Sequence, residues 1–195
     1  MSIAEKLTTV AENQQKVFDA GKQSEYDRFW DNYQQNGERI NYSRAFGGTC
    51  WSDETYNPKY PITATEGGAY LFYGSLITDT KVDIDIGSSS SAATYRFYNA
   101  EKLVTIRKLI VKEGAGYTSC FIGCAALENI TIEGVIGKNF DISDSPKLTH
   151  ESLMSIIDHL KDTKSTLTLT IGSENLAKLT DAEKAIATEK GWTLV

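Results

Sequence analysis

The stretch FIGCAALENITI, residues 121–132, decides the fold that the sequence predicts. Phe121 is followed three positions later by the small Cys124, six positions later by Leu127, and then by alternating isoleucines that end at Ile132. An apolar residue at every second position is typical of a β-strand, because successive side chains of a strand point to opposite faces. The stretch therefore combines three spaced anchor residues with one short strand.

The same pattern occurs three times before this stretch and once, in shortened form, after it. The phenylalanines follow one another at gaps of 26, 25 and 24 residues, at Phe46, Phe72, Phe97 and Phe121. Small residues stand three positions after them, at Thr49, Ser75, Ala100 and Cys124, and six positions after them stand Ser52, Thr78, Leu103 and Leu127. In the fifth copy, SPKL at residues 145–148 matches CAAL at residues 124–127.

Units of 21 to 26 residues are too short to bury an apolar face of their own. When they stack, their Phe, small and Leu positions form successive rungs of one core, and their strands line up as a parallel sheet. The small position fits this packing, because a large side chain there would push the coil outward. We therefore predict an α/β fold over residues 42–148, a solenoid with one short strand per repeat.

Helical patterns precede the repeats. Residues 1–41 predict an N-terminal helical segment, with a capping box of Ser2 and Glu5 at its start and a second helix near residues 24–35. A heptad seam runs through the first helix, at Ile3, Leu7, Val10, Gln14 and Val17. This seam fits either a short intermolecular coiled coil, which would make a homo-oligomer, or a helix that packs on its own domain.

Residues 149–195 predict a cap that covers the last rung of the same solenoid. An apolar stripe with i, i+3, i+4, i+7 spacing predicts a helix over residues 149–161, and alternating apolar residues predict a strand over residues 165–171. A capping box at Thr180 opens another helix, which precedes a last short strand at residues 192–195. Strand, helix and strand in this order allow the two strands to pair in parallel.

The pattern of residues 121–132 resembles the leucine-rich repeats of the BspA-like bacterial proteins. This likeness covers residues 42–148 and is clearest in the last two full copies, because Ser52 and Thr78 stand where leucine is usual. Residues 146–194 also resemble the end of proteins encoded in prophages of gut Firmicutes. These resemblances imply a leucine-rich-repeat solenoid that presents a binding or assembly surface.

The sequence contains no catalytic constellation. It lacks a Gly-x-Ser-x-Gly motif and a phosphate-binding glycine loop, and His150 and His159 are not spaced as paired metal ligands on a helix. The three cysteines, Cys50, Cys120 and Cys124, lack the partners of a four-ligand metal site, so we expect reduced and packed thiols. We therefore expect no enzymatic activity, no metal and no cofactor.

Charge and hydropathy limit the partners. The chain has 20 basic and 26 acidic side chains, a net charge of −6 and no basic cluster, so we expect no nucleic-acid partner. Asp79, Asp83 and Asp85 lack the spacing of a calcium-binding loop and predict a solvent-facing acidic edge. No stretch approaches the ~20 apolar residues of a membrane helix, so we expect no membrane insertion.

The first residues do not have the pattern of a signal peptide. We therefore expect a protein that is cytoplasmic as made. Association with a virion and exposure on a cell surface are both left open by the sequence.

Aromatic residues crowd into the least regular repeats: 12 of the 20 aromatics fall between Tyr26 and Tyr73. Large, rigid side chains with a polar atom are favoured in binding surfaces. The predicted contact residues are Trp51, Tyr56, Tyr60, Tyr70 and Tyr73. The alternative is that these side chains fill the core of repeats whose leucines are missing.

Two functions follow from these observations. The first is a non-enzymatic repeat protein that binds or assembles with another protein, associated with a phage or prophage tail. The alternative is a bacterial surface adhesin or carbohydrate-binding module, whose partner is a cell-surface glycan. A small enzyme would need a set of polar groups that the sequence does not have.

Overall fold

A computed structural model of the chain describes residues 9, 12–16, 21, 46–48, 51–58, 61–63, 70–87, 95–117, 119–163 and 165–195. The chain divides into two compact units, Met1–Glu38 and Arg39–Val195. In the first unit, every described residue is helical and exposed, in agreement with the helix predicted there. Gln14 is one of them. The other members of the heptad seam, and the helix predicted near residues 24–35, lie outside the described residues.

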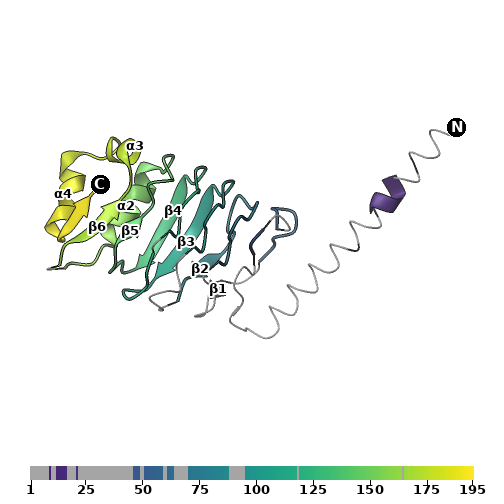
Figure 1. The fold of residues 1–195 in the computed structure, drawn as a ribbon, viewed down its shortest axis with the longest axis horizontal. Coiled ribbons are helices and arrows are strands. Elements are labelled where there is room, and N and C mark those ends of the chain that lie inside the picture. Colours follow the sequence, from purple (N-terminus) through teal and green to yellow (C-terminus); the bar gives the residue numbers. More distant parts are fainter. Residues whose placement is uncertain are drawn as a thin grey trace. The chain divides into compact units, whose positions relative to one another are not determined.

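The second unit contains two parallel β-sheets, so the predicted α/β class with parallel strands is confirmed. Figure 1 shows the first sheet, whose strands lie in chain order: β1 (Ile62–Thr63), β2 (Asp83–Asp85), β3 (Thr105–Val111) and β4 (Asn129–Gly134). One buried row crosses all four strands, from Ile62 through Ile84 and Leu109 to Ile132. The alternating apolar residues of the sequence therefore form the inner face of this sheet.

The second sheet is also parallel and has the order β5-β6-β7. Its strands are β5 (Phe140–Asp141), β6 (Leu167–Thr170) and β7 (Trp192–Leu194). Leu167 pairs with Trp192, so the two strands predicted in the cap form and pair in parallel as expected. The sequence does not predict the short strand β5.

Three helices lie between β5 and β7 in the chain: α2 (His150–Asp158), α3 (Ser173–Leu176) and α4 (Asp181–Glu189). The predicted capping box opens α4, because Thr180 Oγ1 accepts a bond from the Glu183 N–H while the Glu183 carboxylate accepts one from the Thr180 N–H. Gly191 follows α4 with a φ of 86°, and a Cβ at this position would lie 2.4 Å from Thr163 O. Glycine is therefore required where the chain turns from α4 into β7.

Helix α2 covers the edge of the first sheet beside β4 (Figure 1). The Ile130 N–H donates to Ser152 Oγ at 3.0 Å, and the Ile132 N–H donates to Ser155 Oγ at 2.8 Å. Backbone N–H groups at a sheet edge need such partners when no further strand pairs with them. Two serine hydroxyls of α2 thus take the place of a fifth strand.

The four phenylalanine anchors meet in the core, and all are buried. Their ring centroids are 5.3 Å apart for Phe46 and Phe72, 5.2 Å for Phe72 and Phe97, and 5.6 Å for Phe97 and Phe121. The backbone follows the same order, since the Phe72 N–H donates to Arg96 O at 2.7 Å and the Phe97 N–H donates to Cys120 O at 3.1 Å. Segments that are 24 to 26 residues apart in the chain therefore lie side by side.

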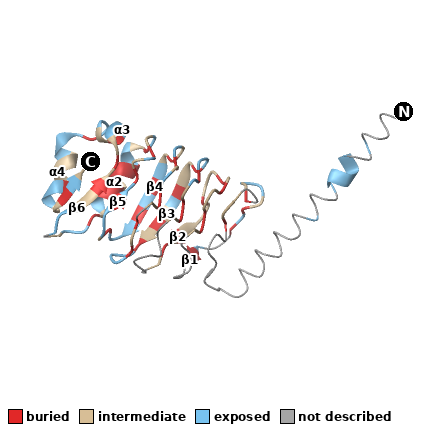
Figure 2. Ribbon diagram, in the orientation of Figure 1, coloured by how far each residue is buried: buried red, intermediate tan, exposed pale blue. Residues whose placement is uncertain are grey.

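The small and leucine positions of the pattern are also buried. The small residues are Ser75, Ala100, Cys124 and Ser145, and the leucines are Leu103, Leu127 and Leu148. Thr49, the first small position, lies outside the described residues. Figure 2 shows how buried residues alternate with more exposed ones along β3 and β4, as the period-2 pattern predicts.

Candidate binding surface

Trp51 and Tyr56, two of the predicted contact residues, are core residues. Trp51 is only 7% exposed, and Tyr56 has no exposed surface. Both rings meet Phe46 edge to face, at 5.4 and 5.5 Å, and the Tyr56 hydroxyl donates to Thr80 O at 2.9 Å. The expectation that these two side chains face a partner is therefore wrong. They fill the core in the part of the chain where the leucine of the pattern is missing.

Tyr70 and Tyr73 are half-buried and belong to a cluster that the sequence reasoning missed in part. Tyr70 stacks on Tyr95 with the ring planes 3° apart and the centroids 5.3 Å apart, and Tyr73 stacks on Tyr98 at 2° and 5.3 Å. Within each turn the two rings meet edge to face, at 5.7 and 5.4 Å. We call these four side chains the tyrosine cluster. Tyr60 lies outside the described residues.

The sequence places these tyrosines at equal positions around two anchors. YLFYG at residues 70–74 and YRFYN at residues 95–99 share a tyrosine two positions before the buried Phe and another one position after it. The Gly74 N–H donates to Tyr98 O at 2.9 Å, so the two turns are hydrogen-bonded like neighbouring strands. Side chains at equivalent positions of the two turns therefore stack on each other. The repeated Tyr-x-Phe-Tyr motif is the signal that identifies Tyr95 and Tyr98.

The backbone of the cluster is strained at Tyr95. Its φ of 59° lies in the left-handed region, which costs a residue with a Cβ about 1–2 kcal/mol. Ser119 has the same φ of 59° two positions before Phe121, so the turn itself demands this conformation. Glycine would meet that demand at lower cost.

The geometry suits the cluster to binding. Each side chain is half-buried and combines an apolar ring with a hydroxyl group. Stacking already orders the four side chains, so little conformational freedom is left to lose when a partner binds.

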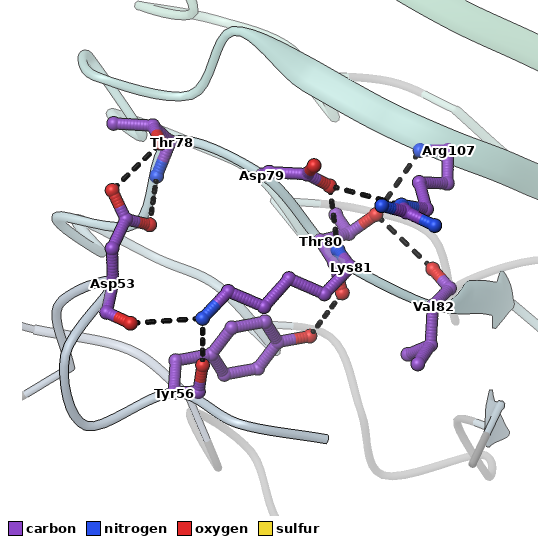
Figure 3. A network of polar contacts seen from close by, with 8 residues as sticks. All are labelled: Asp53, Tyr56, Thr78, Asp79, Thr80, Lys81, Val82 and Arg107. Carbon is purple, nitrogen blue, oxygen red and sulfur yellow. Dashed lines mark hydrogen bonds and ion pairs between the residues drawn. The ribbon is translucent and has the colours of Figure 1, made fainter. Parts of the chain in front are cut away.

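A network of polar contacts links residues 53–56 to residues 78–81 (Figure 3). The Asp53 carboxylate accepts bonds from the Thr78 N–H at 2.8 Å and from Thr78 Oγ1 at 2.7 Å. Lys81 Nζ donates to the backbone carbonyl oxygens of Asp53, at 2.8 Å, and of Tyr56. These groups are engaged with the neighbouring turn, so the network holds the loop in place instead of offering its atoms to a ligand.

The predicted acidic edge lies on the first sheet and is neutralised by basic side chains. Each carboxylate has a partner at 3.5–3.7 Å: Asp79 with Arg107, Asp83 with Lys108, and Asp85 with Lys112. Lys108 Nζ also meets Glu133 at 2.9 Å, and this hydrogen bond raises the pKa of Lys108 and lowers the pKa of Glu133. Among the described residues, no group of three or more His, Cys, Asp or Glu side chains could hold a metal ion.

Cys120 and Cys124 are buried thiols. Burial raises the pKa of Cys120 to about 12 and raises the pKa of Cys124 as well. Cys124 Sγ donates to Phe97 O at 3.0 Å. Protonated thiols are poor nucleophiles and poor metal ligands, so both side chains serve as small packing groups. Cys50 lies outside the described residues.

No protein-family model matches the sequence, and comparisons with curated proteins and with solved structures find no match. In the part of the chain that the structure describes, no helix is both long and apolar enough to cross a membrane. The stacked geometry of the tyrosine cluster makes it the candidate binding site.

Proposed function

We propose that the chain is a solenoid of the leucine-rich-repeat kind, similar to the BspA-like proteins, and that it has no enzymatic activity. Three observations support this. The phenylalanine anchors stack at 5.2 to 5.6 Å, backbone bonds link anchor turns that are 24 to 26 residues apart, and the strands pair in chain order. These are the contacts that stacked coils make with their neighbours. The buried thiols and the fully engaged polar network favour a protein without reaction chemistry.

The proposed function is to bind a macromolecule through the tyrosine cluster. The observation that carries this proposal is the stacking of Tyr70 on Tyr95 and of Tyr73 on Tyr98, with all four side chains half-buried. Ile122, which is 38% exposed, follows in the next turn at the position of Tyr73 and Tyr98. Three turns thus contribute to one extended surface, and a surface of this shape suits a large partner better than a metabolite.

We propose that the partner is a protein of a phage or prophage particle, with the N-terminal helix as a means of assembly. The alternative is a bacterial surface adhesin that binds a cell-surface glycan. The chemistry of the tyrosine cluster also fits a glycan, because a sugar has apolar faces and hydroxyl groups that match those of a phenol ring.

Tyr73→Ala and Tyr98→Ala are each expected to weaken binding by more than ~1 kcal/mol, as truncation of an aromatic hot spot does. The full-length protein is immobilised and exposed in parallel to phage-particle proteins and to a bacterial cell-wall extract, and the affinity of the captured partner is measured by calorimetry. Val135→Ala is the control, because Val135 is an apolar residue of similar exposure, 39%, outside the cluster. This variant should bind like the wild type.

Equal affinity of all three variants would show that the binding surface lies outside the tyrosine cluster. Capture from neither extract would count against the binding function. A partner that free polysaccharide displaces would favour the glycan alternative over the protein partner.

A further inference from the structure

Arg96 places a charged side chain in the core. It directly precedes the Phe97 anchor, and its side chain is fully buried. Among the described residues, none accepts a hydrogen bond from its Nε, Nη1 or Nη2 atoms. An unpaired buried charge is strongly destabilising, and buried polar groups in proteins are almost always hydrogen-bonded. The guanidinium therefore calls for an acceptor with negative charge.

Packing alone does not require an arginine at this position. The Phe46 N–H donates to Leu71 O, the Phe72 N–H to Arg96 O, and the Phe97 N–H to Cys120 O, so Leu71, Arg96 and Cys120 occupy equal places in three neighbouring turns. Leu71 and Cys120 are also fully buried, and neither is charged. The residue directly before the anchor phenylalanine is thus uncharged in the two neighbouring turns, whereas Arg96 is charged.

In the part of the chain that the structure describes, no group near Arg96 neutralises its charge. Burial lowers the pKa of the guanidinium to about 10, which leaves it protonated at neutral pH, and the neighbouring Cys120 thiol stays neutral. Asp85 is near enough to favour the cation, but its carboxylate accepts a bond from the Gly87 N–H at 2.9 Å and pairs with Lys112 at 3.5 Å. The Tyr117 hydroxyl, close to Cys120, donates to Lys112 O at 3.1 Å.

We propose that Arg96 is an internal anion site that binds one small monovalent anion, such as chloride or formate, through its guanidinium nitrogens. One buried positive charge calls for one negative charge. Because the guanidinium nitrogens have almost no accessible surface, neighbouring side chains must shift to admit the ion, which favours a small ion over a bulky one. Arg96 lies between Tyr95 and Tyr98 in the sequence. The bound anion would therefore stabilise the turn that supplies half of the tyrosine cluster. This site is independent of the proposed binding function.

The first test is thermal unfolding of the full chain in sodium chloride, bromide, formate and gluconate at equal ionic strength. For the wild type, each small anion should raise the unfolding midpoint by about 3–5 °C per tenfold increase in concentration above the dissociation constant. Gluconate is too bulky for an enclosed site and should give no such rise. Arg96→Leu, which copies Leu71, should unfold at the same midpoint in all four salts. Arg107→Leu removes a charge whose side chain is 59% exposed and should keep the wild-type response.

The second test uses the wild type alone and does not depend on whether Arg96→Leu folds. A crystal grown in bromide should show an anomalous peak within hydrogen-bonding distance of the Arg96 guanidinium. Absence of a peak there would overturn the proposal. The same anion response in the wild type and in Arg96→Leu would overturn it as well.

Discussion

Replacing Phe97 by alanine is expected to lower the free energy of unfolding by about 3–5 kcal/mol, the usual cost of removing a buried aromatic ring. Phe97 lies between Phe72, at 5.2 Å and 4°, and Phe121, at 5.6 Å and 6°. Its removal leaves a cavity that both neighbours line, and their stacked rings cannot collapse into it without losing contact with the next anchor. Equilibrium unfolding in urea measures the change.

Two further variants make this result specific. Phe97→Leu keeps most of the apolar volume and should cost clearly less than Phe97→Ala. Ile122→Ala truncates an exposed side chain of the next turn and should stay within about 0.5 kcal/mol of the wild type. A Phe97→Ala protein with an unchanged urea midpoint would show that the anchor is not part of the core.

Leu127→Ala is the second large effect, expected at about 2–5 kcal/mol. Leu127 is fully buried, and its N–H donates to Cys124 O at 3.0 Å, which sets the leucine at a fixed distance from the small position of the same turn. Leu103 and Leu148 hold the equal places in the pattern of the neighbouring segments and are buried as well. Equilibrium unfolding in urea also measures the change in free energy of unfolding for Leu127→Ala. An unchanged midpoint would contradict the alignment of these three leucines.

The regular part of the fold could be predicted because its chemistry repeats. Phe97, Ala100 and Leu103 have counterparts at nearly constant spacing. The anchor position is phenylalanine in four copies, and the residue three positions later is small in each of them. The alternation around Ile130 predicts β4, and the capping box at Thr180 predicts the start of α4. These signals are local, so they do not depend on knowing which segments lie next to each other.

The rest depends on neighbours that the sequence does not reveal. Trp51 and Tyr56 are aromatic residues in an irregular segment, where spacing does not tell the inner face from the outer one. Arg96 stands where the pattern tolerates any residue that fits between its neighbours, and only the packed structure shows that its charge is enclosed. Tyr95 and Tyr98 lie outside the crowded aromatic segment, so their stacking becomes visible only when the two turns are aligned.

A double-mutant cycle on Phe72 and Phe97 tests whether turns one repeat apart in sequence are neighbours in space. The free energies of unfolding of Phe72→Leu, Phe97→Leu and the double variant are compared with that of the wild type. Residues in contact should show a coupling energy of about 0.5 kcal/mol or more. Phe72 and Phe121 are separated by Phe97 and should be additive within about 0.5 kcal/mol. Additivity of Phe72 with Phe97 would contradict the stacked arrangement, and with it the tyrosine surface built on the same two turns.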